Sequence, residues 1–223
     1  MIKLCIFDLD GTLIDSLADL AGAMNHALKS EGFDTHPVES YRKMVGNGVS
    51  VLADRAAGGS DRLTPEVKER ILAAFSDYYV EHCVEHTLPY DGIPKMLDKL
   101  SEMGVLYAVN SNKPDLFSKL IVKVLFPLFS FAQVWGKKKE YDPKPSPDGV
   151  KGIAEELGVS LDEVLYIGDS DVDVYTAKNA SVRFCGVSWG FRSVEELRSA
   201  GASVIADTPE DILRIVRSSG EEK

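Results

Sequence analysis

The second half of the chain alternates short apolar runs with amphipathic segments, and this alternation limits the possible folds more than any other feature. Each run of β-forming residues is followed by a segment with helical periodicity, often opened by a proline or a capping residue. Such alternation is typical of a parallel sheet with right-handed helical crossovers. We expect strands at 105–109, 131–135, 164–167 and 182–187, helices at 114–125, 146–157 and 171–180, and then a last helix, strand and helix through residue 216.

Residues 15–89 interrupt this alternation, because no strand pattern occurs between a first apolar strand at 3–7 and a turn cluster at 88–92. We expect helices at 17–30, 38–44, 49–57 and 65–85, and a further helix at 94–103 after the turn. The sequence therefore predicts an α/β protein. Its parallel-sheet core would comprise residues 1–14 and 90–223, and residues 15–89 would form an inserted all-helical domain.

The composition excludes several classes of partner. A formal net charge of −10 over 223 residues disfavours binding to nucleic acid or to an anionic membrane surface, since both need a basic face. No apolar run is long enough to span a bilayer, and the start of the chain does not resemble a signal peptide. The three cysteines are far apart, as in proteins with reduced thiols. We therefore expect a cytoplasmic protein that is a monomer or a homodimer.

Two carboxylates follow the first strand. Asp8 and Asp10 are two residues apart, so an extended chain directs both to one side, and Gly11 permits a sharp turn after them. Ligands bind at this end of the strands in an open parallel sheet. Two like charges about 4 Å apart repel by about 4 kcal/mol at an effective dielectric of 20, so the pair must share a proton or hold a cation. The alternative is that these are ordinary capping or turn acids.

Three later positions could complete a site with Asp8. Ser111 follows the strand at 105–109 and precedes a helix, whose free amide groups can bind an anion. Lys144 stands between two prolines and would project from a stiff turn. Asp169 and Asp173 belong to an acidic segment where a strand becomes a helix. Repulsion among its carboxylates is costly unless a cation or a lysine offsets the charge. Taken singly, each could instead be a helix cap or a surface loop.

Together these motifs resemble the haloacid dehalogenase superfamily, and the resemblance covers the whole chain. It implies a five-stranded Rossmann-like core with strand order 5-4-1-2-3 and an inserted helical cap of the C1 type. The matching motifs, in chain order, are Asp8-Leu9-Asp10-Gly11-Thr12, Ser111, Lys144 in Lys-Pro-x-Pro-Asp, and Gly168-Asp169-Ser170-x-x-Asp173.

The resemblance also implies a mechanism, in which Asp8 attacks phosphorus and forms an aspartyl phosphate. Asp10 would protonate the leaving oxygen and later deprotonate water. Mg²⁺ would be held by Asp8, by the backbone carbonyl of Asp10 and by Asp169. Lys144 and Ser111 would bind the transferring phosphoryl group. The remaining implied roles are contacts with the substrate at Leu9, Thr12 and Asn112, and an outer role for Asp173, which would pair with Lys144 or bind a metal-bound water.

Substrate choice would depend on the helical insertion. The segment Gly46-Asn47-Gly48, followed by Val-x-x-Leu-Ala, is similar to phosphoglycolate phosphatases, and its amides could face an anion. A helix end followed by a turn is the simpler interpretation. Because Asp10 is present, phosphate chemistry is favoured over dehalogenation. We expect a phosphatase for a small phosphorylated metabolite, with phosphoglycolate the leading candidate. A β-phosphoglucomutase-like enzyme, a phosphonate-cleaving enzyme and a non-catalytic phosphometabolite-binding module remain alternatives.

Overall fold

The computed structural model describes residues 1–220, and the chain divides into two compact units. Unit 1 contains Met1–Ile14 and the chain from Pro89 onward, and unit 2 contains Asp15–Leu88. Two short strands, β2 (Ile14–Asp15) and β3 (Leu88–Pro89), occupy the two passages between the units and form a two-stranded sheet. Each unit is described below by itself.

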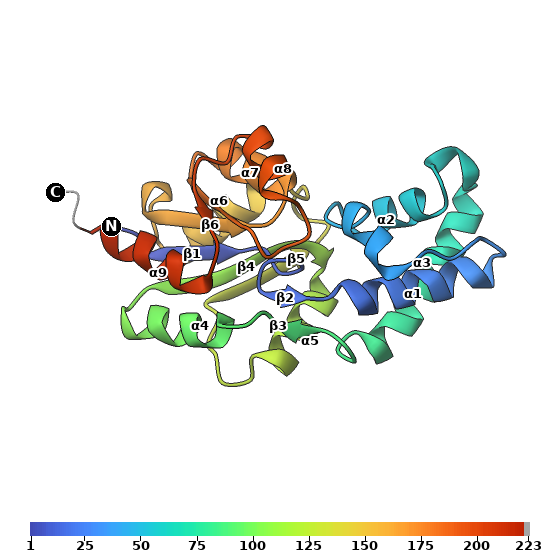
Figure 1. The fold of residues 1–223 in the computed structure, drawn as a ribbon, viewed down its shortest axis with the longest axis horizontal. Coiled ribbons are helices and arrows are strands. Elements are labelled where there is room, and N and C mark those ends of the chain that lie inside the picture. Colours follow the sequence, from blue (N-terminus) through green and yellow to red (C-terminus); the bar gives the residue numbers. More distant parts are fainter. Residues whose placement is uncertain (221–223) are drawn as a thin grey trace. The chain divides into compact units, whose positions relative to one another are not determined.

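Unit 1 is built on a six-stranded sheet with the order β5-β4-β1-β6-β7-β8, in which all the pairs are parallel (Figure 1). Strand β1 is central, and its last residue, Phe7, pairs with Val109 on one side and Ile167 on the other. The order of five strands that the resemblance implied is confirmed, and the last strand expected after residue 187 is the short β8, which adds a sixth beside β7. The strands are β1 (Leu4–Phe7), β4 (Leu106–Pro114), β5 (Gln133–Lys137), β6 (Val164–Gly168), β7 (Arg183–Val187) and β8 (Ile205–Ala206).

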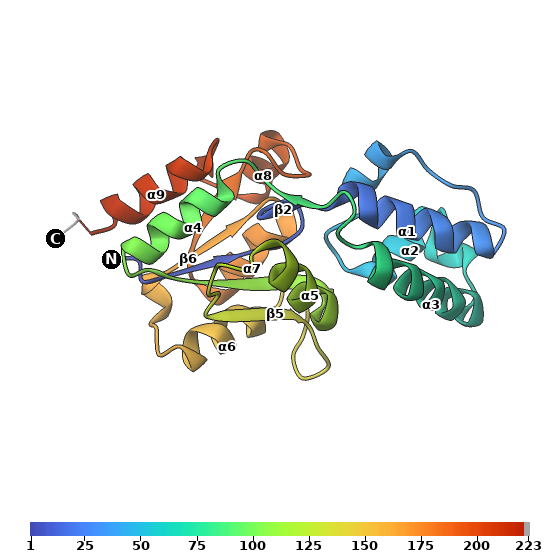
Figure 2. The same ribbon diagram turned by 90° about the horizontal axis from the view of Figure 1, so that it is seen from below.

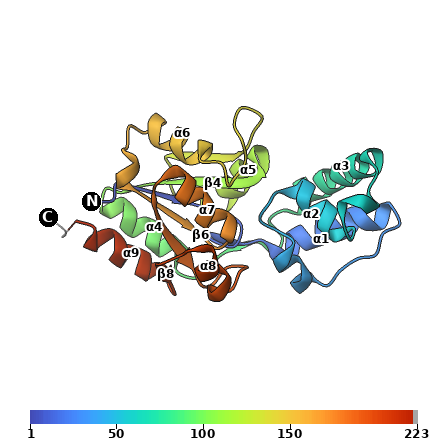
Figure 3. The same ribbon diagram turned by 90° about the horizontal axis from the view of Figure 1, so that it is seen from above.

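Helices cover both faces of this sheet. Figure 1 shows α4, α5 and α9 on one face and α6, α7 and α8 on the other. Helices α4 and α9 lie side by side in Figure 2, and Figure 3 views the molecule from the side of α6, α7 and α8. The helices are α4 (Ile93–Glu102), α5 (Asp115–Leu125), α6 (Asp148–Glu156), the 3₁₀ helix η3 (Leu161–Glu163), α7 (Asp171–Ala180), α8 (Val194–Ala200) and α9 (Pro209–Ser218).

The apolar core beneath α6 and α7 determines the directions in which the side chains of β1 point. Leu4 and Ile6 of β1 are fully buried and belong to one apolar cluster with Val150, Ile153 and Ala177 from the two helices. Side chains alternate between the faces of a strand, so burial of Leu4 and Ile6 here determines the direction of every side chain along β1. The packing of this layer therefore anchors the strand that leads directly into Asp8.

Unit 2 is helical. Its expected first helix is confirmed at both ends, but residues 38–43 form a 3₁₀ helix, in which Met44 donates its backbone N–H to the carbonyl of Tyr41. The helix expected at 65–85 was too long, since α3 ends at His82. The elements are α1 (Leu17–Ser30), η1 (Val38–Lys43), α2 (Val49–Ala56), η2 (Ser60–Arg62) and α3 (Pro65–His82).

A buried carboxylate accounts for the early end of α3. The side chain of Asp19, in the first turn of α1, accepts hydrogen bonds from the backbone N–H groups of His86 and Thr87 and from the Thr87 hydroxyl. A continued helix would need the same N–H groups for its own carbonyls. The side chain of Asp19 is only 2% exposed, so these bonds tie the end of unit 2 to its first helix.

No helix among residues 1–220 is long and apolar enough to cross a membrane.

The strand that carries Ser111 differs most from expectation. We expected it to end at residue 109, but β4 continues to Pro114, and α5 begins at Asp115. Its pairing with β5 is irregular over this extension, because Asn110 pairs with Trp135 and Pro114 with Lys137. Four steps along β4 thus match two steps along β5, which is a bulge in the ladder. Residues 110–113 are polar, so the hydrophobic pattern of the sequence does not reveal this extension of the strand.

Candidate active site

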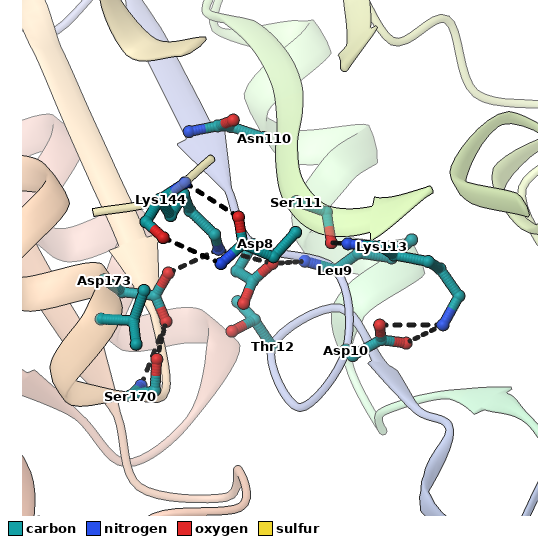
Figure 4. A network of polar contacts seen from close by, with 12 residues as sticks. Asp8, Leu9, Asp10, Thr12, Asn110, Ser111, Lys113, Lys144, Ser170 and Asp173 are labelled. Atoms are coloured by element: carbon teal, nitrogen blue, oxygen red, sulfur yellow. Dashed lines mark hydrogen bonds and ion pairs between the residues drawn. The ribbon is translucent and has the colours of Figure 1, made fainter. Parts of the chain in front are cut away.

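The site is built around Asp8, the first residue after β1. The backbone N–H of Asp8 donates to the carbonyl of Ile167, which continues the parallel ladder to the end of the sheet (2.9 Å). One carboxylate oxygen, Oδ1, lies 2.8 Å from the ammonium nitrogen of Lys144 and accepts the backbone N–H of Leu9 at 2.7 Å (Figure 4). Asp8 is buried, so its carboxylate is held by the protein rather than by bulk water.

Lys144 joins two acidic residues of the site. Its Nζ lies 2.7 Å from Oδ1 of Asp173 as well as 2.8 Å from Asp8, and its side chain is 3% exposed. Burial alone would lower the pKa of Lys144, but Asp173 and Asp8 offset it and raise the pKa well above its ordinary value. Asn112 holds the loop in place, since its side-chain amide accepts the N–H of Lys144 (2.8 Å) and donates to the carbonyl of the same residue (3.1 Å).

Asp173 is fully buried and accepts hydrogen bonds on both of its oxygens. Oδ2 accepts the backbone N–H and the hydroxyl of Ser170, which forms a capping box at the start of α7. Oδ1 accepts the hydroxyl of Tyr166 at 3.2 Å, in addition to the ammonium of Lys144. Because both of its oxygens already accept hydrogen bonds, Asp173 is a structural partner of Lys144 (Figure 4).

Asp169 follows β6 and faces the turn after β1. Its Oδ1 accepts the Thr12 hydroxyl at 3.2 Å, and its Oδ2 accepts the backbone N–H of Phe191 at 2.8 Å. The carboxylate is enclosed by two glycines: a Cβ added to Gly11 would lie 2.4 Å from Oδ2, and one added to Gly190 would lie 2.2 Å from the Asp169 Cβ. Two loops thus approach Asp169 as closely as only glycine permits.

This close approach leads to a prediction about stability. Replacing Gly190 with alanine is expected to destabilise the protein by about 1–3 kcal/mol, because the added methyl group overlaps Asp169 and the carbonyl of Gly11. The measurement is the midpoint of urea unfolding. Gly22→Ala is the matched control, since nothing lies within 4 Å of a Cβ there and alanine in a helix is worth about 0.5–1 kcal/mol over glycine. Equal midpoints for the two variants would contradict the packing argument.

The acidic residues of the site repel one another. Burial, followed by the charge of Asp173, raises the pKa of Asp8 to about 7, although Lys144 opposes this shift. Burial and the charges of Asp173 and Asp8 raise the pKa of Asp169 to about 8. One oxygen from each of Asp8, Asp169 and Asp173 lies within 4.8 Å of the others. A compact group of hard oxygen donors, with raised pKa values, fits a divalent cation that would relieve the repulsion.

The second acid, Asp10, lies apart from this cluster. Its two carboxylate oxygens contact the ammonium nitrogen of Lys113 at 2.8 and 2.9 Å. Ser111 is buried within β4 rather than in a loop before a helix, and its hydroxyl accepts the backbone N–H of Lys113 at 3.2 Å. The expected environment of Ser111, at the N-terminus of a helix, was therefore wrong.

The structure gathers most of the predicted residues in unit 1. It holds Asp8, Leu9, Asp10, Thr12, Ser111, Asn112, Lys144, Asp169 and Asp173. Gly46, Asn47 and Gly48 belong to unit 2, between η1 and α2. Gly46 and Gly48 have φ values of 109° and 85°, which only glycine adopts freely. Their expected role in substrate binding stays a prediction.

Three residues of the site were missed in the sequence. Lys113 directly follows Ser111 and Asn112. Because the strand was expected to end at residue 109, nothing in the sequence indicated that the Lys113 side chain would be held in the site. Tyr166 could have been found from period two, since it lies on the same face of β6 as Val164 in the buried cluster. Phe191 contributes only its backbone N–H, so no side-chain pattern marks it.

Comparison with known proteins shows what the whole chain is similar to. Residues 5–187 match the family model described as haloacid dehalogenase-like hydrolase. Phosphoglycolate phosphatase of Vibrio parahaemolyticus is 32% identical, over 98% of this chain and 97% of the relative. Phosphoglycolate phosphatase of Pseudomonas putida is 35% identical, over 92% of this chain and 76% of the relative.

The fold is also similar to solved structures. A protein from Lactobacillus delbrueckii subsp. bulgaricus, provisionally assigned as a phosphoglycolate phosphatase, superposes with a TM-score of 0.90 at 37% identity. The match covers 96% of this chain and 98% of the other. The likeness therefore extends over both units of the chain.

Proposed function

The chain belongs to the haloacid dehalogenase-like hydrolases and is a phosphoric monoester hydrolase, and from this premise we propose that it hydrolyses phosphoglycolate through an aspartyl-phosphate intermediate. The observation that carries the proposal is the buried contact between Asp8 and Lys144, 2.8 Å apart beside Asp169. A carboxylate nucleophile and a cation that can neutralise a phosphoryl group thus share one enclosed site. Phosphoglycolate is proposed because relatives that are 32% and 35% identical are phosphoglycolate phosphatases, and because Gly46-Asn47-Gly48 fits the resemblance noted in the sequence.

In the proposed reaction an oxygen of Asp8 attacks phosphorus as the bond to the ester oxygen breaks. Lys144 binds a phosphoryl oxygen, and the Ser111 hydroxyl and the Leu9 amide add hydrogen bonds as negative charge develops. Asp10 gives a proton to the leaving oxygen and then takes one from the water that attacks the phosphoenzyme. Thr12 orients Asp169, and Asn112 holds the loop of Lys144, so both act through their neighbours.

We propose Mg²⁺ as the cofactor, with Asp8, the carbonyl of Asp10 and Asp169 as the protein ligands. When bound, the ion supplies positive charge that lets Asp8 approach a phosphate dianion and stabilises the transferring group. Asp173 is left out of this set, because Lys144, Tyr166 and Ser170 already occupy its two oxygens. The raised pKa values of Asp8 and Asp169 support a cation at this place.

The same pKa values predict how stability depends on pH. In metal-free protein, Asp8 and Asp169 keep protons up to about pH 7 and about pH 8, whereas the unfolded chain loses them near 3.8. Their contribution to stability is therefore fully present below the unfolded value and is lost as pH rises through 7 to 8. We expect the Tm of metal-free protein to fall from pH 6 to about pH 8 and then to level off toward pH 9. Added Mg²⁺ should raise Tm more at pH 9, where fewer protons compete for the carboxylates.

Differential scanning calorimetry with and without Mg²⁺ measures this effect. Asp169→Asn should remove most of the shift caused by Mg²⁺. Asp171→Asn, a change of the exposed carboxylate two positions along the chain, should retain it. A Mg²⁺ shift that is the same at both pH values, or that survives in Asp169→Asn, would contradict the proposed ligand set.

A substrate panel tests the activity itself. Purified protein with Mg²⁺ is given phosphoglycolate, β-glucose 1-phosphate, other sugar phosphates, nucleotides and pyrophosphate, and phosphate release is followed. We expect the highest kcat/KM for phosphoglycolate. Even, weak activity over many esters would remove the substrate assignment but keep the mechanism. Transfer of phosphate within β-glucose 1-phosphate would indicate the mutase instead, and no reaction with any ester would favour a binding module.

A further inference from the structure

Lys113 is a buried lysine that the reaction described above does not use. Its side chain is 3% exposed, and its ammonium nitrogen lies 2.8 and 2.9 Å from the two carboxylate oxygens of Asp10. Lysine is almost never buried to this extent without a charged partner. Because Asp10 is 103 residues away in the chain, the contact is a product of the tertiary fold.

The backbone around Lys113 is held on both sides. Its N–H donates to the hydroxyl of Ser111 at 3.2 Å, and its carbonyl accepts the hydroxyl of Ser118 at 3.3 Å. The bulge between Asn110 and Pro114 changes the directions of the intervening side chains, which a regular strand would alternate between two faces. Lys113 thus reaches Asp10 from a fixed strand, whereas Asp10 stands in the turn after β1 (Figure 4).

We propose that Lys113 is a positioning residue that holds the carboxyl group of Asp10 for its two proton transfers. This inference rests on the proposed function. In the first transfer, an oxygen of Asp8 bonds to phosphorus and the bond between phosphorus and the ester oxygen breaks. The electron pair of the broken bond goes to the leaving oxygen, which also takes the proton of Asp10. In the second, water bonds to phosphorus and gives a proton to Asp10, and the electron pair of the Asp8–phosphorus bond returns to Asp8. Lys113 keeps its own proton throughout.

A turn carboxylate without this contact could adopt several rotamers. A misplacement of about 1 Å at a reacting group can cost on the order of 100-fold in rate. Lys113→Met keeps an unbranched side chain only one atom shorter and removes the charge, so we expect it to lower kcat for phosphoglycolate about 100-fold. The loss in the rate of Asp8 phosphorylation should depend on the leaving group, because only a basic leaving oxygen needs the proton of Asp10.

The experiment therefore compares phosphoglycolate with 4-nitrophenyl phosphate, whose leaving group is weakly basic. In Lys113→Met, 4-nitrophenol should appear in a rapid burst equal to the enzyme concentration, followed by slow turnover. The burst arises because phosphorylation of Asp8 no longer needs Asp10, while attack by water still does. Mass spectrometry should detect the accumulated phosphoenzyme. A purely structural role for Lys113 would slow both phases alike.

A double-mutant cycle shows whether Lys113 acts through Asp10. Adding Lys113→Met to Asp10→Asn should change kcat less than about 3-fold, although it costs about 100-fold in the wild-type background. Lys113→Arg should recover part of the rate, since a guanidinium can also contact both oxygens. Lys119→Met, which breaks an exposed ion pair with Asp115, is the matched control and should retain full activity.

Other outcomes overturn the proposal in distinguishable ways. Equal slowing of the phosphorylation of Asp8 by both esters, or additive losses in the cycle, would show that Lys113 does not act through Asp10, and the proposed function would stand. Wild-type protein that is inactive on every ester would overturn the proposed function and this inference with it. Lys113→Gln is the second variant if Lys113→Met does not fold, with folding checked by Tm, and it should show the same burst.

Discussion

Asp8→Asn is expected to lower kcat for phosphate release by about 10⁴- to 10⁶-fold, the range found when a nucleophile is removed. The amide of asparagine cannot form an aspartyl phosphate, and hydrolysis of an unactivated phosphate monoester without a catalyst is extremely slow. The Lys144 ammonium and the Leu9 amide would remain, so substrate binding should persist while the chemical step is lost. Phosphate release under single-turnover conditions measures the effect.

The fold should survive this substitution, because it removes one of three mutually repelling carboxylates. We expect a Tm equal to or above that of metal-free wild type. Asp91→Asn, at an exposed carboxylate, is the matched control and should retain full activity. Activity retained by Asp8→Asn on every ester, or a phosphoenzyme detected in that variant, would contradict the covalent mechanism.

Lys144→Met is expected to cost about 3–5 kcal/mol of folding stability in metal-free protein, as well as most of the activity. Lys144 neutralises Asp8 and Asp173 at 2.8 and 2.7 Å, and its removal leaves both carboxylates buried without their cation. The loss should be larger at pH 9 than at pH 6, because Asp8 gives up its proton near pH 7. Urea unfolding at the two pH values measures it.

Two further variants assign the cause. Adding Asp173→Asn to Lys144→Met should restore part of the stability but none of the activity, since it removes a buried charge without replacing the lysine. Lys119→Met, in an exposed ion pair, should change stability by less than about 0.5 kcal/mol. A loss below about 1 kcal/mol for Lys144→Met would contradict the view that the buried ion pair holds this loop.

Helices with clear end signals could be predicted closely. The helix at 17–30 and the one at 171–180 were both found with the expected bounds, because apolar periodicity and local turn chemistry determine them. The helix beginning at Pro65 was predicted correctly at its start, where Thr64 accepts the N–H of Val67. Its end was wrong, because Asp19, far away in the sequence, binds the backbone that would have continued it.

The order of five strands was also predictable, but the course of β4 was not. Residues 110–113 are polar and resemble a loop, and they become strand only because β5 pairs with them and neighbouring side chains bury them. The last strand was expected from the alternation of elements, and it is only two residues long, paired with β7. Short or polar strands owe their existence to partners, which local pattern does not contain.

The sequence by itself determined that Asp8, Lys144, Asp169 and Asp173 lie at one end of the sheet, since each follows or faces the carboxyl end of a parallel strand. The resemblance offered pairing with Lys144 as one of two roles for Asp173, but only the tertiary structure shows the full set of contacts between lysines and carboxylates. Lys144 contacts Asp8 and Asp173, and Lys113, which lies within the bulge of β4, contacts Asp10. The alternation of strands and helices follows from periodicity along the chain, whereas a contact a few ångströms long depends on register, burial and the packing of loops from distant segments.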